Sequence, residues 1–271
     1  MNNVELYLFW ATIFFYSAPI GFFFYGLAVK TEKPFEIGVN IVLCGLIIQT
    51  IALVLRWFFS GHMPGNNIYE LNAVGAWCAV LIYLWLQHYY HQTRVLGIVV
   101  LVISISMMLY GISKPHGIGP LSDEYQSPWF YIHIISAFLA YSCYVIATSA
   151  AILFLFGQLE NERWARMRLP SSNFLEDINA RFVAYGFGGH AVMLASGSIW
   201  ANSAWGSYWN WDPVETWSLI TWLIYAFHLH ARTFLGWSGR RLAWISIVAL
   251  IAIVFTFWGV SHLPSKDYEH L

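Results

Sequence analysis

Long uninterrupted runs of apolar residues alternate with short polar connections along almost the whole chain. A helix needs about 20 predominantly apolar residues to cross the hydrocarbon core of a bilayer. Continuous runs favour such helices over the alternating strands of a membrane barrel. We therefore expect an all-α, polytopic membrane helix bundle of about eight transmembrane helices, forming a single integral membrane domain over residues 1–271. The expected spans are Leu6–Val29, Ile37–Phe59, Leu71–Tyr90, Val95–Ile112, Phe130–Phe156, Phe182–Ala201, Thr216–Leu235 and Leu242–Val260.

Composition supports a membrane location, because 59% of the residues are hydrophobic and only 10% are charged. Soluble domains carry about 25% charged residues. The net charge of −1 gives no electrostatic reason to expect a nucleic-acid partner. The first apolar run is too long for a cleavable signal, so we expect it to span the membrane. The three cysteines lie in apolar runs and form no CxxC pair, which argues against thiol-redox chemistry.

Basic residues are concentrated in the connections that follow the first, third, fifth and seventh expected spans. Cytoplasmic loops carry the excess of lysine and arginine in membrane proteins, so we expect both termini on the outer (periplasmic or luminal) side. The longest connection, around residues 161–177, is expected to be amphipathic or irregular. The basic residues on the inner side are Lys30, Lys33, Arg94, Arg163, Arg166, Arg168, Arg181, Arg232, Arg240 and Arg241, against Arg56, Lys114 and Lys266 outside.

The expected outer loop before the seventh span is rich in tryptophan. Six of the 15 tryptophans fall between Trp200 and Trp222, interleaved with Gly206 and Asn210. An interfacial aromatic belt explains one or two tryptophans at a helix end. A cluster of this density favours a flat aromatic platform for a large planar ligand, which stacking would bind. We assign this role to residues 200–217.

The sequence Asp212-Pro213-Val214-Glu215 is typical of a helix start, with an N-cap aspartate, proline at the first helical position and glutamate at the third. These residues would begin the seventh span sharply at the membrane surface. Free backbone N–H groups at such a start favour an anion. We therefore expect them to face a carboxylate of the ligand.

Several of the ten histidines lie in or beside expected spans, where a polar side chain suggests a function. His133 and His262 lie at outer helix ends and could give two axial nitrogen ligands to a haem iron; interfacial solvation is the alternative. His230 lies in the inner half of the seventh span. His190, beside two glycines, is a hypothetical second ligand with His230, and His62 is either an outer-site support or a structural loop residue.

The segment WGSYWNWDPVETWSLITWLIYAFHLHAR resembles the WWD signature of the CcsA (ResC) family, the haem-handling membrane subunit of system II cytochrome c maturation. Similarity extends to SGHMPGNNIYE at residues 60–70, SPWFYIHIISAFLAYSCY at residues 127–144 and GVSHL at residues 259–263. The resemblance covers most of the chain, from about the second span to the end. It favours CcsA or HemX over CcmC.

The resemblance implies a haem-handling role in the bacterial cytoplasmic or thylakoid membrane. The chain would move b-type, non-covalently bound haem to the outer face and present it to the CxxCH segment of apocytochrome c, with a CcsB (ResB) partner. It implies His133 and His262 as outer ligands and His230 as an inner ligand. The implied haem platform comprises Trp205, Gly206, Trp209, Trp211, Asp212, Pro213, Glu215 and Trp217.

Three function classes remain open at this point. The first is a haem exporter that is also a component of a haem lyase (cytochrome c synthase). The second is a HemX-like haem-binding assembly or regulatory protein without ligase activity. The third is a transporter or channel with an aromatic constriction. The transporter is the weakest, because we find neither inverted halves nor a set of membrane carboxylates. No acid–base pair or nucleophile stands out, so catalytic residues stay unassigned. Asp212 and Glu215 are better explained as helix caps.

Overall fold

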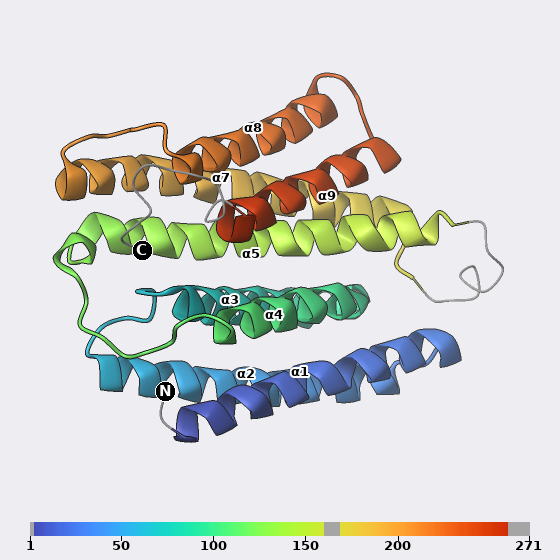
Figure 1. The fold of residues 1–271 in the computed structure, drawn as a ribbon. Helices are drawn as coiled ribbons and strands as arrows, with labels where there is room; N and C mark the ends of the chain where they lie inside the picture. Colours follow the sequence, from blue (N-terminus) through green and yellow to red (C-terminus); the bar gives the residue numbers. More distant parts are fainter. Residues whose placement is uncertain (1–2, 160–168, 260–271) are drawn as a thin grey trace. The chain divides into compact units, whose positions relative to one another are not determined.

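The computed structural model describes residues 3–159 and 169–259, and within them all regular secondary structure is helical. The expected all-α helix bundle is confirmed, and eight α-helices occur in this part of the chain (Figure 1). They are α1 (Asn3–Val29), α2 (Lys33–Ser60), α3 (Ile68–Tyr89), α4 (Gly97–Ile112), α5 (Pro128–Gly157), α7 (Ser172–Trp205), α8 (Pro213–Thr233) and α9 (Arg240–Val254). Short 3₁₀ turns η1 (His91–Leu96) and η2 (Asp123–Tyr125) precede α4 and α5, and a π-helical turn η3 (Phe255–Gly259) extends α9.

Seven helices in the described residues are long and apolar enough to cross a bilayer, so the chain is an integral multi-pass membrane protein. The fourth of them combines η1 and α4 over 22 residues, which explains why this span is short as an apolar run. Helix α8 has a suitable length of 21 residues but is not among the seven. Its tryptophans and histidines lower its mean hydropathy.

One correction concerns α7, which begins at Ser172 rather than near Phe182. The Ser171 carbonyl accepts the Leu175 amide, and the exposed pair Asp177 and Arg181 joins successive turns. Side chains four residues apart on a helix are neighbours. The end of the connector, which we expect to be amphipathic or irregular, is therefore helical from Ser172 onward, and α7 is 34 residues long.

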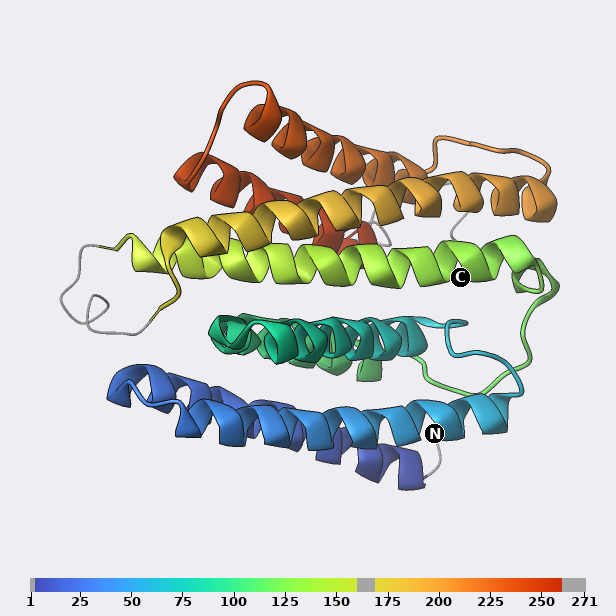
Figure 2. The same ribbon diagram turned by 180° about the vertical axis from the view of Figure 1, so that it is seen from behind.

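The chain divides into two compact units. Unit 1 contains residues 1–123 and 155–175, and its first two helices lie side by side and antiparallel (Figures 1 and 2). Glycines on α2 face aromatic rings of α1: a Cβ on Gly45 would lie 2.8 Å from the Tyr16 ring. The buried Tyr16 hydroxyl donates to Gln49 Oε1 at 2.6 Å. Small residues thus admit large rings between neighbouring membrane helices.

Unit 2 contains residues 124–154 and 176–271, and buried polar groups join its helices. The Asn179 amide nitrogen donates to the Ala147 carbonyl of α5 and to Ser246 Oγ of α9, both at 2.8 Å. Its oxygen lies 3.1 Å from His228 Nε2 of α8. One amide on α7 therefore contacts α5, α8 and α9. These hydrogen bonds fix the rotation of each helix about its axis, because apolar contact gives little net driving force between helices in lipid.

Candidate functional site

The tryptophan-rich loop folds back along the helix that precedes it. Helix α7 ends at Trp205, and Gly206 then takes a positive φ of 75° that reverses the chain. Ser198 Oγ donates to the Tyr208 carbonyl at 2.8 Å. Ser198 lies seven residues before the end of α7, or about 10 Å at 1.5 Å per residue. The loop thus lies along the C-terminal end of α7.

The tryptophans in and beside this loop differ in exposure and do not form one flat platform. Trp205 and Trp211 are 55% and 69% exposed. Trp209 and Trp211 meet at 84°, and Trp200 and Trp205 at 59°. Trp217, expected in the same surface, instead contacts Phe255 at 4.5 Å between ring centroids. Edge-to-face contact is the usual preference of aromatic pairs, so the loop presents several separate ring faces.

The start of α8 confirms the predicted cap. Asp212 Oδ1 accepts from the amides of Val214 and Glu215 at 2.7 and 3.0 Å, and Pro213 occupies the first helical position. Trp211 takes a positive φ of 59°, which is uncommon outside glycine. The expectation that free helix-start amides face a ligand is wrong for these two residues, because the Asp212 carboxylate already accepts both of them.

Glu215 stabilises the loop rather than presenting a free carboxylate. Its Oε2 accepts from the Asn210 amide at 2.8 Å. Burial raises the pKa of the Glu215 carboxyl above its usual value, although the backbone amides of Asn210, Trp211 and Asp212 favour the charged form. The carboxylate therefore joins the loop to the first turn of α8.

His133 of α5 lies beside the same turns of α7 as the loop. Its Nδ1 lies 2.9 Å from the Met193 carbonyl, and its ring lies 5.8 Å from the Trp200 ring. Ser198, which donates to the Tyr208 carbonyl of the loop, lies five residues after Met193 on α7. Residues 193–200 of α7 thus hold both the predicted outer histidine and the tryptophan-rich loop. The other predicted outer ligand, His262, lies outside the described residues.

His190 is fully buried and lies near these turns of α7, not with His230. Its Nε2 is 3.2 Å from Ser218 Oγ, and its Nδ1 is 3.5 Å from the Tyr144 hydroxyl. Ser218 and His230 are 12 residues apart on α8, about 18 Å along the axis. The structure therefore does not bring His190 and His230 together as a ligand pair. The expected proximity is wrong because α7 begins at Ser172 rather than near Phe182, so His190 lies further from the N-terminal end of its helix than the apolar run indicates.

His230 is exposed on α8 and stacks on Phe234 with 5.0 Å between ring centroids. Its neighbour His228 is the buried histidine of this helix and contacts Asn179. Sequence reasoning gave no role to His228. Their spacing indicates that His228 and His230 face different sides of α8, because residues two apart on a helix do not share a face. The sequence does not show which of the two sides is buried.

His62 belongs to unit 1 and is a buried loop residue. Its two ring nitrogens each lie 3.1 Å from a backbone oxygen, of Met63 and of Gly119. A neutral imidazole donates to one of these carbonyls, and in either tautomer the ring contacts both the loop after α2 and the loop after α4. This geometry favours the structural alternative for His62.

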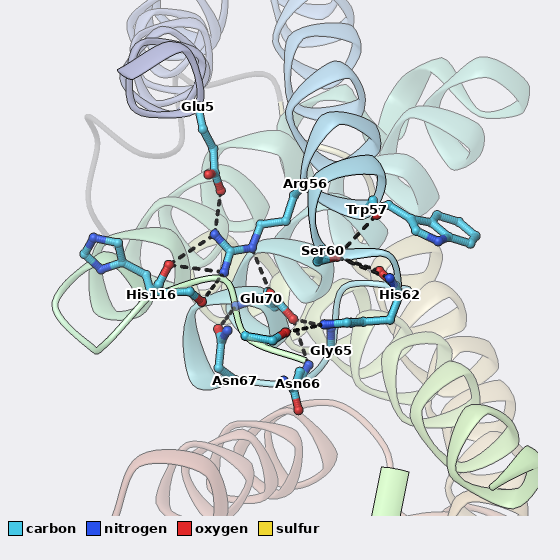
Figure 3. A network of polar contacts seen from close by, with 12 residues as sticks. Glu5, Arg56, Trp57, Ser60, His62, Gly65, Asn66, Asn67, Glu70 and His116 are labelled. Atoms are coloured by element: carbon cyan, nitrogen blue, oxygen red, sulfur yellow. Dashed lines mark hydrogen bonds and ion pairs between the residues drawn. The ribbon is translucent and has the colours of Figure 1, made fainter. Parts of the chain in front are cut away.

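A buried ion-pair cluster, which sequence reasoning missed, lies beside this loop (Figure 3). Arg56 of α2 donates to Glu5 Oε1 at 2.9 Å and to Glu70 Oε1 at 2.8 Å. Its remaining N–H groups reach the carbonyls of His116 and Gly117. The charge distribution of the sequence identifies Arg56 only as a basic residue of the expected outer side. The sequence feature that could have predicted the cluster is a single arginine within an otherwise apolar run, together with acidic residues in the neighbouring helices.

Comparisons with known proteins agree with the resemblance drawn from the tryptophan-rich segment. A family model described as "Cytochrome C assembly protein" matches residues 65–265. The chain is 33% identical over 221 residues to "Cytochrome c biogenesis protein CcsA" of Chlamydomonas reinhardtii, covering 79% of this chain and 63% of that protein. A protein of the same description from Guillardia theta is 31% identical over 257 residues, covering 86% and 85%.

A third relative, "Cytochrome c biogenesis protein CcsA" of Mesostigma viride, is 28% identical over 295 residues and covers 97% of this chain and 96% of its own length. The similarity therefore runs through all the membrane helices and is not confined to one motif. The chain belongs to the cytochrome c assembly protein family and is a CcsA-type cytochrome c biogenesis protein.

Proposed function

We propose that this protein handles b-type haem as a non-covalently bound cargo during cytochrome c maturation. Haem enters at His230 in the inner half of the membrane and is bound at the outer face by His133 and His262. There it is presented for covalent attachment to the CxxCH segment of apocytochrome c. A CcsB (ResB) partner works with the chain, and both termini lie on the outer side.

The observation that carries this proposal is the position of His133. Its ring and the tryptophan-rich loop contact one short stretch of α7, between Met193 and Trp200. A metal-binding imidazole and a set of exposed indole rings are thus held together by helix packing. Bis-histidine ligation and aromatic contact suit a large planar iron compound.

The donor chemistry of these residues fits haem. A carbonyl can only accept, so the Met193 oxygen holds the proton of a neutral His133 on Nδ1 and leaves the Nε2 lone pair for iron. The indole Nε1 of Trp209 is buried without a hydrogen-bond partner. An indole N–H is a donor only. A propionate carboxylate would supply the acceptor that it lacks.

The protein's contribution is binding and orientation, while bound haem supplies the reactive vinyl groups and the iron chemistry. Asp212 and Glu215 support the loop through backbone amides and are not assigned acid–base roles. Catalytic residues remain unassigned. A partly exposed set of rings at the outer face leaves one edge of the macrocycle accessible to the apocytochrome.

The exposed position of His230 supports the proposed partner. His230 is exposed on α8, while the buried face of the helix carries His228. An imidazole that faces away from its own bundle can share a haem with a ligand from another membrane helix. We assign that second inner ligand to the CcsB (ResB) subunit rather than to His190.

An absorption spectrum of the purified protein tests the haem sites. Split α and β bands are expected for six-coordinate low-spin haem. His133→Ala and His230→Ala should each remove part of the haem, whereas His88→Ala, which changes an exposed histidine of unit 1, should not. A protein that cannot be loaded with haem, or equal spectra for all three variants, would refute the proposal.

Reconstitution with a CcsB partner and a CxxCH reporter tests the ligase role. Covalent haem on the reporter supports the synthase function. Bound haem without covalent transfer would instead support the second candidate, a HemX-like assembly or regulatory protein. His88→Ala is again the matched control, and it should transfer haem as the unchanged protein does.

A further inference from the structure

The His133 ring occupies a notch on α7 that only glycine leaves open. A Cβ added to Gly197 would lie 2.5 Å from His133 Nδ1 and 2.9 Å from Cε1. All three of its nearest neighbours would be atoms of this one ring. Real Cβ atoms essentially never approach so closely. The space that Gly197 leaves is therefore the space that His133 uses.

Two further contacts hold the same ring. Its Nδ1 lies 2.9 Å from the Met193 carbonyl, one helical turn before Gly197. The Trp200 ring lies 5.8 Å away at 36°, and the Trp200 indole nitrogen is itself held by the Glu124 carbonyl at 2.7 Å. A backbone carbonyl in a long helix cannot rotate towards another partner. The ring is thus placed by backbone groups and by a tryptophan with a fixed orientation.

A histidine that binds a metal usually donates its other N–H to a carbonyl or carboxylate, which fixes the tautomer and the ring orientation. The Met193 carbonyl meets this requirement for Nδ1. The ring can reach that carbonyl only because the glycine one turn later has no side chain. A methyl group at Gly197 would move Nδ1 away from the carbonyl and release the constraint on the tautomer.

We propose that Gly197, together with the Met193 carbonyl, is a positioning element that sets His133 for iron ligation through Nε2. This inference rests on the proposed function, in which His133 binds haem. Gly197 and Met193 do not touch the cargo themselves. They act through the imidazole, by selecting its tautomer and the direction of its Nε2 lone pair.

Two other glycines of α7, Gly188 and Gly189, provide matched controls. Gly188 faces open space, and nothing lies within 4 Å of a Cβ added there. Gly189 faces α5, as Gly197 does, but its nearest neighbour is Ala140 Cβ at 3.3 Å. Gly188→Ala tests the effect of a methyl group on helix α7 itself. Gly189→Ala tests a general effect on packing between α5 and α7.

The first readout needs no haem. In haem-free protein labelled with ¹⁵N-histidine, His133 should show a protonated Nδ1 and an unprotonated Nε2, assigned by comparison with His133→Ala. Gly197→Ala should abolish this single-tautomer signal, while Gly188→Ala and Gly189→Ala keep it. An unchanged His133 tautomer in Gly197→Ala would overturn the proposal, whatever the haem measurements show.

The second readout is the spectrum and midpoint potential of outer-site haem. Gly197→Ala should lose the same low-spin signal that His133→Ala loses, with both glycine controls unchanged. If His133→Ala leaves the haem spectrum intact, the proposed function fails. If His133→Ala loses the signal but Gly197→Ala keeps both the tautomer and the signal, only the positioning role fails.

A double variant covers the case in which Gly197→Ala folds poorly. With the ring removed, the added methyl group has room. His133→Ala/Gly197→Ala should therefore unfold at the same temperature as His133→Ala alone, whereas Gly197→Ala should unfold below the unchanged protein. A double variant that is as unstable as Gly197→Ala would show that the glycine acts on something other than His133, and would overturn the inference.

Discussion

The buried ion-pair cluster of unit 1 predicts a large loss of stability when its central arginine is removed. Arg56 Nε donates to Glu70 Oε1 at 2.8 Å and Nη1 to Glu5 Oε1 at 2.9 Å. The side chains are 1%, 2% and 7% exposed for Arg56, Glu70 and Glu5. Arg56→Met keeps an unbranched apolar side chain and removes every one of these donors.

The expected cost follows from what the variant leaves behind. Two buried carboxylates lose their counterion, and the His116 carbonyl loses both of its Arg56 donors. Removing one partner of a buried ion pair costs about 3–5 kcal/mol, because the remaining charge stays buried without compensation. We expect the free energy of unfolding of Arg56→Met to fall by about this amount. The loop that carries His116 should also become accessible to protease.

Arg181→Met is the matched control, because Arg181 pairs with Asp177 at the same N–O distance of 2.8 Å. These side chains are 58% and 50% exposed. An exposed pair contributes about 0–1 kcal/mol. The assay is unfolding of the purified protein in mixed detergent micelles, followed by tryptophan fluorescence and by limited proteolysis. The difference between the two variants measures the effect of burial.

A loss of about 1 kcal/mol or less for Arg56→Met, equal to that of Arg181→Met, would refute this reasoning. Glu5→Gln gives a second test. It keeps an oxygen acceptor for Arg56 and leaves the guanidinium paired with Glu70. We expect a much smaller loss than for Arg56→Met. If Glu5→Gln is the more damaging change, the cluster does not depend on the buried charge of Arg56.

Three further predictions use the same structure. Asp212→Ala should cost about 1 kcal/mol and speed hydrogen exchange at the Glu215 amide, while Asp212→Asn keeps the cap and much of the protection. Gly97→Ala should lower the free energy of unfolding by about 1–3 kcal/mol, because its Cβ would lie 2.5 Å from atoms of Phe23 and Tyr83. Gly21→Ala, where nothing lies within 4 Å of the added Cβ, is the control in thermal unfolding. His190→Ala should lower thermal stability by removing two buried contacts but leave the spectrum of bound haem unchanged, and a loss of the haem signal would contradict the structural role.

Local features of the chain were predicted well. The apolar runs predicted the approximate positions of the eight α-helices found in residues 3–159 and 169–259, because a bilayer requires about 20 apolar residues for each span. Asp212 and Pro213 predicted the first residue of α8, because a helix cap depends only on residues that are neighbours in the sequence. The family resemblance came from the same loop, and the comparisons confirmed it.

The sequence by itself thus determined the helices, the membrane class, the cap of α8 and the family. Only the tertiary structure decided that the tryptophan-rich loop folds back along α7, that His190 meets Ser218 rather than His230, and that Arg56 lies between two buried glutamates. The physical reason is the solvent. Lipid is as apolar as the protein core, so a membrane helix can be apolar all round and its sequence does not show which face is buried. Rotation and axial register depend on side chains from other helices, such as the Gly197 notch that receives His133.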